Sequence, residues 1–451
     1  ASHFEPPRSY GRRALRGPGS SAPPRVREAG QPSSAAADAP SAGRSRGVSR
    51  LCQRSLRGRR LSRMTTQTFW VDTLRSPRRI LAPMVGQSEL AFRVLARSCG
   101  ADVCYTEMLH ADRFVNEPSY REEHFETNAE DRPLIVQFCG HDARVLLSAA
   151  RIVEGDCDAV ELNCGCPQRS ASNAGFGAFL AADAIVDIVR LLSSSLSVAV
   201  VVKMRLRESV EATVRLAQAV QGAGCAALTV HCRTRHQRRG GPCDWDALKR
   251  VCEAVSIPVV ANGGIEKFSD FEECLATTGA DAIMSGESAL ENVSIFNGTK
   301  VTPAGQVQLA LKYLGFAVLY KARPAVAQEH LRTMLHFCPK DDQDALAKAE
   351  TLESLRRVIE DVAKRVARDP RRNEPARETW YRRHRSKPSD VSAFCASHPD
   401  ASVVAATGHV RCEATGHEMA PQLSVLEAHW AGKAYGRAAK RLKLTKDKGA
   451  S

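Results

Sequence analysis

Eight short runs rich in β-branched residues recur between residues 79 and 286 of this 451-residue chain. They lie at 79–83, 102–106, 134–138, 159–163, 198–204, 227–231, 258–262 and 282–286. Most of the intervals have helical spacing, as at 89–97, 143–153, 182–192, 210–221 and 268–275. Strands that alternate with helices form a parallel sheet, and eight such units in about 220 residues predict a closed (β/α)8 TIM barrel. An open doubly wound sheet is the alternative, but the first strand lacks the G-x-G-x-x-G turn of its dinucleotide-binding version.

The sequence divides into five regions around this barrel. They are a tail rich in Ser, Ala, Pro, Gly and Arg (1–63), the barrel (64–300), a helical domain (301–370), a linker (371–394) and a small module with a basic end (395–451). The tail has too few apolar residues to offset its chain entropy, so we expect it to be disordered. The helical domain is predicted from helical patterns at 307–319, 325–334 and 344–367.

The net charge of +14 is concentrated at the two ends of the chain. Residues 1–63 carry a net +11 and residues 371–451 a net +7, whereas residues 64–370 carry −4. A basic tail is typical of contact with nucleic acid or of a targeting segment. The longest apolar runs, such as 198–202, are far below the roughly 18 residues of a membrane helix, so we expect no membrane partner.

The tail and the cysteines together bear on the cellular compartment. The fifteen cysteines are scattered through a long chain without a secretory leader, which favours a reducing compartment, the cytoplasm or nucleus. The Arg-rich tail, 1–63, also fits a transit peptide for the mitochondrion or plastid. Alternatively, synthesis starts at Met64, the first methionine, and the tail is not translated.

Polar and glycine residues stand at the carboxyl ends of the predicted strands, where the sites of such barrels are built. They are Pro83, Met84, Gln137, Asn163, Cys166, Lys203, Arg205, His231, Arg233, Asn262, Gly263, Gly264, Gly286 and Glu287. Glycine turns after the last two strands let backbone N–H groups approach a phosphate. Lys203 supplies a charge, and Gln137 and His231 can hydrogen-bond a planar heterocycle. A phosphorylated, ring-bearing cofactor follows, and flavin mononucleotide (FMN) fits better than a dinucleotide.

A signature segment and five flavin motifs in this sequence resemble those of the tRNA-dihydrouridine synthases, particularly the cytosolic eukaryotic type that acts on positions 16 and 17. The signature is Asn163-Cys-Gly-Cys-Pro-Gln168, followed by Gly-Ala-Phe-Leu at 177–180. The flavin motifs correspond to 82–85, 136–138, 202–205, 230–234 and 261–264, and the resemblance covers about 79–370. It implies an FMN enzyme that takes a hydride from NADPH and reduces the C5–C6 double bond of a tRNA uridine.

The resemblance also implies roles for single residues. Cys166 protonates C5, and Asn163, Arg205 and Arg233 contact the substrate. A thiol suits this step because its ordinary pKa, about 8.5, leaves it protonated near neutral pH. The cofactor is assigned to Pro83, Met84, Gln137, Lys203, His231, Asn262, Gly263, Gly264, Gly286 and Glu287. Since the barrel region has no excess of positive charge, tRNA binding is assigned to basic residues of the helical domain, namely Lys321, Arg323, Arg332, Arg356, Arg357, Lys364 and Arg365.

The last region permits two interpretations. Cys395, His398, His409 and Cys412, with His417 beyond, include ligand types that zinc accepts, but the usual Cys-rich spacing is missing. The other interpretation is an ordinary interaction module with surface histidines and buried cysteines. Segments 410–418 and 432–435 resemble the surfeit locus protein 2 family. The basic end adds RNA affinity or acts as a nuclear signal.

Two other functions compete with the tRNA-modifying enzyme, which we expect to be a monomer. One is an FMN-dependent reductase or dehydrogenase of a small pyrimidine, which would need neither the basic tails nor the helical domain. The other is an RNA-binding protein without catalysis, against which the intact Cys166, Lys203 and His231 argue.

Overall fold

A computed structural model describes residues 68–237, 242–374, 401–403, 410–412 and 418–419. The predicted tail and most of the predicted linker and module lie outside these residues, so the five-region division of the chain stays a prediction. No helix in the described part of the chain is both long enough and apolar enough to cross a membrane.

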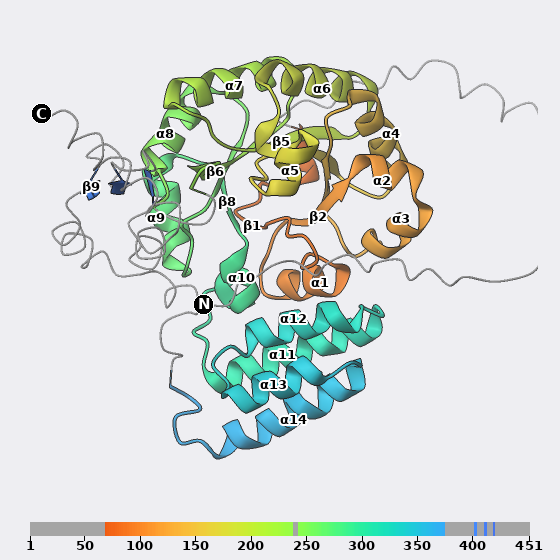
Figure 1. Ribbon diagram of the computed structural model, residues 1–451, viewed down its shortest axis with the longest axis vertical. Coiled ribbons are helices and arrows are strands. Elements are labelled where there is room, and N and C mark those ends of the chain that lie inside the picture. The colour runs from red at the N-terminus through yellow and green to blue at the C-terminus, as the bar shows by residue number, and fades with distance from the viewer. Residues whose placement is uncertain (1–67, 238–241, 375–400, 404–409, 413–417, 420–451) are drawn as a thin grey trace, which may run out of the picture. The chain divides into compact units, whose positions relative to one another are not determined.

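Eight parallel strands form the centre of the structure (Figure 1). They are β1 (Arg79–Leu81), β2 (Cys104–His110), β3 (Leu134–Cys139), β4 (Ala159–Cys164), β5 (Ala199–Leu206), β6 (Leu228–Thr234), β7 (Val259–Asn262) and β8 (Ala282–Ser285). Each strand pairs with the next along the chain from β2 to β8, and β8 pairs with β1. A bridge between Ile80 and Val103 joins β1 to the start of β2 and closes the ring. The predicted TIM barrel is confirmed.

Alternation along the strands decides which residues point into the barrel. Ile135, Ala159 and Val201 belong to one buried cluster inside the ring, whereas their neighbours Leu134, Val160 and Val202 pack in the cluster that includes the outer helices. Two residues further along each strand, the inward row continues with polar side chains, which are Gln137, Glu161 and Lys203. The period of two therefore carries the apolar barrel interior directly into the polar residues of the site.

Helices surround the ring, and those predicted from the longest patterns are present. The barrel helices are α1 (Leu90–Ser98), α2 (Ala111–Asn116), α3 (Pro118–His124), α4 (Ala143–Val153), α5 (Arg169–Ala174), α6 (Ala182–Ser195), α7 (Val210–Gly222), α8 (Trp245–Ala254), α9 (Ser269–Thr278) and α10 (Glu287–Glu291). Three further short helices are η1 (Thr68–Thr73), η2 (Gly177–Phe179) and η3 (Val293–Phe296). Figure 1 shows α4, α6, α7, α8 and α9 following one another around the ring.

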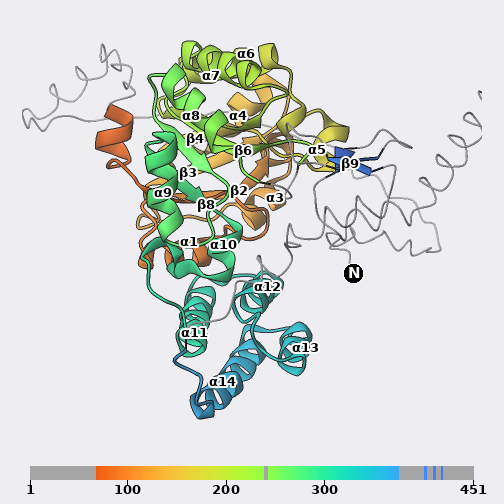
Figure 2. The same cartoon turned by 90° about the vertical axis from the view of Figure 1, so that its left-hand side faces the viewer.

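Four helices follow the barrel and pack together (Figure 2). They are α11 (Pro303–Leu319), α12 (Pro324–Met334), α13 (Lys340–Lys348) and α14 (Leu352–Arg368). The helical pattern over 344–367 corresponds to two helices, because the chain leaves the helical conformation at Ala349 and a new helix begins after Thr351. The hydroxyls of Thr351 and Ser354 cap the new helix reciprocally, which stabilises a separate start.

A buried carboxylate joins these helices to the barrel. Glu89, at the start of α1, accepts hydrogen bonds from the Tyr313 hydroxyl at 2.7 Å and from Nε2 of His330 at 2.9 Å. The His330 ring is fully buried and stacks on Phe92 with 4.3 Å between ring centroids. Burial raises the pKa of Glu89, but the two hydrogen bonds and the charge of His330 outweigh it and hold that pKa below its ordinary value.

Three short antiparallel strands are described near the C-terminus. They are β9 (Ala401–Val403), β10 (Val410–Cys412) and β11 (Glu418–Met419), with β10 in the middle.

Candidate active site

A cavity of about 310 Å³ opens at the carboxyl ends of the barrel strands. All fourteen residues predicted for the cofactor, the substrate and the proton donor line it. The structure therefore brings the predicted site residues together, whereas the role of each one stays a prediction. Further lining residues that the sequence did not single out include Gln87, Met108, Ser285 and Glu266.

A chain of buried hydrogen bonds runs beneath the cavity from β4 to β3 and back. The backbone N–H groups of Gly165 and Cys166 donate to Oδ1 of Asn163, at 3.0 and 2.9 Å. Its Nδ2 then donates to Oε1 of Gln137 at 2.8 Å, and Nε2 of Gln137 donates to Oε2 of Glu161 at 2.5 Å. Since backbone N–H groups only donate, they fix the orientation of the Asn163 amide and, through it, that of the Gln137 amide. Glu161 must therefore accept the last hydrogen bond.

Glu161 is the functional residue that the sequence reasoning missed. It is fully buried, and burial raises the pKa of its carboxyl to about 7 even though Lys203 and the hydrogen bond from Gln137 act to lower it. Its position two residues before Asn163, on the same inward row, was the available signal. Because its neighbours in the sequence are mostly apolar, Glu161 looks like an ordinary residue of a buried strand.

The loop that carries Cys166 is held on three sides. Oδ1 of Asn163 accepts the N–H of Cys166, and Nε of Arg205 donates to the carbonyl of Gly165 at 2.9 Å. The N–H of Ala178 donates to the Cys166 carbonyl at 3.1 Å. Gly177 approaches so closely that a Cβ there would lie 2.8 Å from that carbonyl oxygen, and its φ of +65° also favours glycine. The Gly-Ala-Phe-Leu segment of the motif thus packs the cysteine loop in place.

The two cysteines of the motif lie in different surroundings. Cys166 is partly exposed and lines the cavity, and burial raises the pKa of its thiol, which therefore keeps its proton at neutral pH. Cys164 is buried in the cluster that includes the outer helices and does not line the cavity. The cavity thus has one protonated thiol at its edge.

Lys203 and His231 also line the cavity, and their surroundings determine their charge. Nζ of Lys203 donates to Oδ1 of Asn262 at 2.8 Å, and Nδ2 of Asn262 donates to the Met284 carbonyl at 3.0 Å. Burial lowers the pKa of Lys203 to about 8, against the attraction of Glu161. Burial, together with the nearby Arg205, also lowers the pKa of His231 well below its ordinary value, so His231 is neutral and can both donate and accept.

The glycine turn after β7 packs against this group. Gly263 has a φ of +103°, and a Cβ there would lie 2.7 Å from Cδ2 of His231. Gly264 has a φ of +82° and a Cβ would lie 3.3 Å from Nε1 of Trp245. The backbone conformation and the close neighbours both require glycine at these two positions, which line the cavity.

The predicted substrate groups are engaged within the protein. Both ends of the Asn163 amide are hydrogen-bonded, and Arg205 also donates to the Thr234 carbonyl at 3.2 Å. Through these bonds, Asn163 and Arg205 hold the loop that carries Cys166 in place. Contact with a substrate through the same atoms would require some of these bonds to be exchanged.

Among the described residues no cluster of metal-ligating side chains occurs. Of the four predicted zinc ligands, Cys412 is buried, and Cys395, His398 and His409 lie outside the described residues, as does His417. The zinc site stays a prediction, and so does the resemblance to surfeit locus protein 2.

The fold and the site define a TIM-barrel protein with a ligand cavity at the carboxyl ends of its strands and a protonated thiol beside it. The family model for dihydrouridine synthase (Dus) matches residues 80–378, more than half of the chain. The chain belongs to the dihydrouridine synthase family.

Similar curated proteins carry matching names. A tRNA-dihydrouridine(16/17) synthase-like protein of Mus musculus is 40% identical over 315 residues, which are 68% of this chain and 66% of the mouse protein. The tRNA-dihydrouridine(16/17) synthase of Saccharomyces cerevisiae is 42% identical over 235 residues, 50% of this chain and 56% of the yeast protein. A tRNA-dihydrouridine(20a/20b) synthase-like protein of Homo sapiens is 39% identical over 230 residues, 50% of this chain and 72% of the human one. The chain thus matches just under two thirds of the mouse protein's length.

Proposed function

We propose that this protein is an FMN-dependent tRNA-dihydrouridine synthase that reduces the C5–C6 double bond of a tRNA uridine with NAD(P)H. The observation that carries the proposal is the convergence of all fourteen motif residues on one cavity at the barrel end. The relatives named for positions 16 and 17 support those positions as the target. NADPH is the reductant that we propose.

The residues of the cavity fit FMN. Gly263 and Gly264 line the cavity and are proposed to offer backbone N–H groups to the phosphate, and a side chain at Gly263 would collide with His231. Neutral His231 and the cationic Lys203 both line the cavity and are proposed to hydrogen-bond the flavin ring. Pro83, Met84 and Gly286 supply an apolar wall, where a Cβ on Gly286 would lie 3.4 Å from the Met84 sulfur. When bound, FMN supplies the hydride for C6 of the uracil.

Cys166 supplies the proton in this proposal. Hydride addition at C6 leaves an electron pair at C5, which takes the proton of the Cys166 thiol, and solvent later returns a proton to the sulfur. Burial keeps that thiol protonated, as a general acid requires. Asn163, Arg205 and the Gly177 segment hold the loop, so the acid is positioned before the base enters.

The cavity admits the base only when the uridine is turned out of the tRNA stack, which costs a few kcal/mol. Arg233 lines the cavity and is proposed to contact the inserted nucleotide. The helical domain is proposed to grip the tRNA backbone. Four of its predicted basic residues already pair with acids: Arg323 with Glu123, Arg357 with Glu353, Lys364 with Asp361 and Arg365 with Asp342. We further propose a monomer in the cytoplasm or nucleus, or in the mitochondrion or plastid if residues 1–63 act as a transit peptide.

The proposal is tested with the full chain, FMN, NADPH and tRNA transcribed without modifications. Mass spectrometry of the digested tRNA is expected to find two added mass units on one or two D-loop uridines. A protein that binds FMN but leaves the tRNA unchanged and reduces a free pyrimidine would favour the small-substrate alternative.

A further inference from the structure

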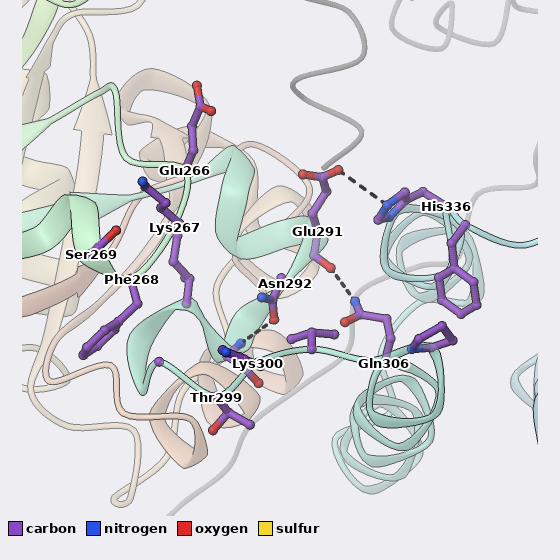
Figure 3. Close-up of a pocket in the computed structure, with 16 residues that line it drawn as sticks. Glu266, Lys267, Phe268, Ser269, Glu291, Asn292, Thr299, Lys300, Gln306 and His336 are labelled. Atoms are coloured by element: carbon purple, nitrogen blue, oxygen red, sulfur yellow. Dashed lines mark hydrogen bonds and ion pairs between the residues drawn. The ribbon is translucent and has the colours of Figure 1, made fainter. Parts of the chain in front are cut away.

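A second cavity, of about 460 Å³, lies where the barrel meets the helical domain (Figure 3). Its walls come from the loop after β7, the segment from α10 to α11, the first turn of α11 and the residues just after α12. Glu266 lines both this cavity and the candidate active site, so the two adjoin at that residue. None of the predicted roles uses this space.

Gln306 brings a buried amide oxygen without a hydrogen-bond partner to the lining of this cavity. Gln306, in the first turn of α11, is 3% exposed, and its Nε2 donates to the carbonyl of Glu291. Its Oε1 has no hydrogen-bond partner, and Figure 3 shows the amide pointing into the cavity. Leaving a buried acceptor unpaired is unfavourable, so this oxygen is a place for a ligand that donates an N–H.

The other lining residues define the rest of such a ligand. Phe337, Ile295 and Pro303 give the cavity apolar surface, which suits a flat ring. Lys300 is exposed at its edge, on the side opposite Glu291 and His336 in Figure 3, and Lys267 adds a second cation. The lining also has two carboxylates: Glu291, which lies 3.9 Å from Nε2 of His336, and Glu266, which Figure 3 shows at the end of the cavity away from His336.

We propose that this cavity binds a nucleotide, with an N–H group of the base on Oε1 of Gln306 and a phosphate at Lys300. An apolar space with one buried acceptor and a cation at its edge matches a base that carries a phosphate. Binding of a nucleotide in this cavity does not depend on the proposed function, whereas the source of that nucleotide does. The adenylate part of NADPH and a tRNA nucleotide close to the target share this chemistry, and the adjoining wall at Glu266 brings either one beside the active site.

Direct binding tests the cavity without any need for catalysis. The full chain, loaded with FMN so that the first cavity is filled, is titrated with AMP in a calorimeter. AMP is expected to bind at one site, with about tenfold weaker binding in Gln306→Leu and several-fold weaker binding in Lys300→Ala. Gln308→Leu and Lys312→Ala change exposed residues of the same helix and should leave the affinity unchanged. Because Lys300 is exposed, its variant reports on binding even if Gln306→Leu folds poorly.

The source of the nucleotide follows from two further measurements on the same variants. If it is NADPH, Gln306→Leu raises the KM for NADPH in oxidation without tRNA and leaves tRNA affinity unchanged. If it is a tRNA nucleotide, the reverse holds. A failure of AMP to bind, or equal affinity in wild type and both variants, would mean that only water fills the cavity and would overturn the inference. AMP binding by a protein that makes no dihydrouridine would instead overturn the proposed function alone.

Discussion

The Oδ1 atom of Asn163 accepts the backbone N–H of Cys166 at 2.9 Å, so the residue proposed to read the substrate also holds the proposed proton donor. The Asn163 amide also donates to the Gln137 amide, which donates in turn to the buried carboxyl of Glu161. These hydrogen bonds fix the orientation of both amides. A group in the barrel interior therefore supports the loop at the surface of the cavity. The orientation of the Gln137 and Asn163 amides is therefore linked to whether Glu161 holds a proton.

Asn163→Asp should disturb this chain in a pH-dependent way. A carboxylate at 163 can only accept, so the Gln137 amide must turn over, and its Oε1 then faces Glu161, which must hold a proton. The variant should thus raise the pKa of Glu161 above its already raised value of about 7. A group whose pKa is raised by folding loses stability as the pH rises, so the deficit against wild type should grow from about pH 6 to about pH 8.5, reaching about 1–3 kcal/mol. Urea unfolding at both values measures it, and a deficit independent of pH would contradict the chain as described.

Gly177→Ala should damage the site through the cysteine loop. A Cβ at 177 would lie 2.8 Å from the Cys166 carbonyl oxygen, so either the loop or the Gly-Ala-Phe-Leu segment must move. Gly175→Ala is the matched control, because its φ of +68° imposes similar backbone strain with nothing within 4 Å of the new Cβ. Both variants should lose about 1 kcal/mol of stability from strain, and only Gly177→Ala should also lose tRNA reduction, about tenfold or more. Equal activity in the two would show that Gly177 does not position Cys166.

Glu89→Gln should weaken the junction between the barrel and the helical domain. The folded protein holds the pKa of Glu89 below its ordinary value, so its contribution is full above the unfolded pKa of about 4.5 and is lost as the pH falls below it. At pH 7 the variant should be about 1–3 kcal/mol less stable than wild type, and the difference should shrink near pH 3. Tyr313→Phe, which removes one hydrogen bond to the same carboxylate, should cost less. Urea unfolding is again the measurement, and a difference that increases toward acid pH would contradict the assigned charge.

Arg357→Ala and Lys364→Ala should weaken tRNA binding without loss of stability. Their salt bridges lie at the surface of α14, where such pairs contribute about 0–1 kcal/mol. If each side chain neutralises one phosphate, its removal should lower the slope of log affinity against log salt by about 0.9. Arg190→Ala breaks a similar exposed pair on the barrel helix α6 and serves as control. Filter binding of unmodified tRNA over a salt series decides the matter, and equal slopes for all three variants would exclude this face of α14.

The barrel and the location of its site could be predicted from the sequence, because strand periodicity is local and parallel strands bring their carboxyl ends together. The predicted residues Gln137, Lys203 and His231 were found at one cavity for that reason. The role of Glu161 could not be predicted, because it depends on a hydrogen bond between neighbouring strands. The close approach of Gly177 to Cys166 likewise depends on how a loop folds back, and the break at Ala349 on a cap that interrupts an otherwise continuous helical pattern.

The proton donor is the central claim, and a single-turnover experiment tests it most directly. The full-chain enzyme with bound FMN is reduced by NADPH without oxygen and mixed with unmodified tRNA, and dihydrouridine is followed over time. Cys166→Ala should retain FMN and NADPH oxidation but form dihydrouridine about 10² to 10⁴ times more slowly than wild type, as expected for loss of a positioned acid. Cys164→Ala should remain close to wild type, because that thiol is buried away from the cavity. A Cys166→Ala enzyme as fast as wild type, or one faster than Cys164→Ala, would contradict the assignment.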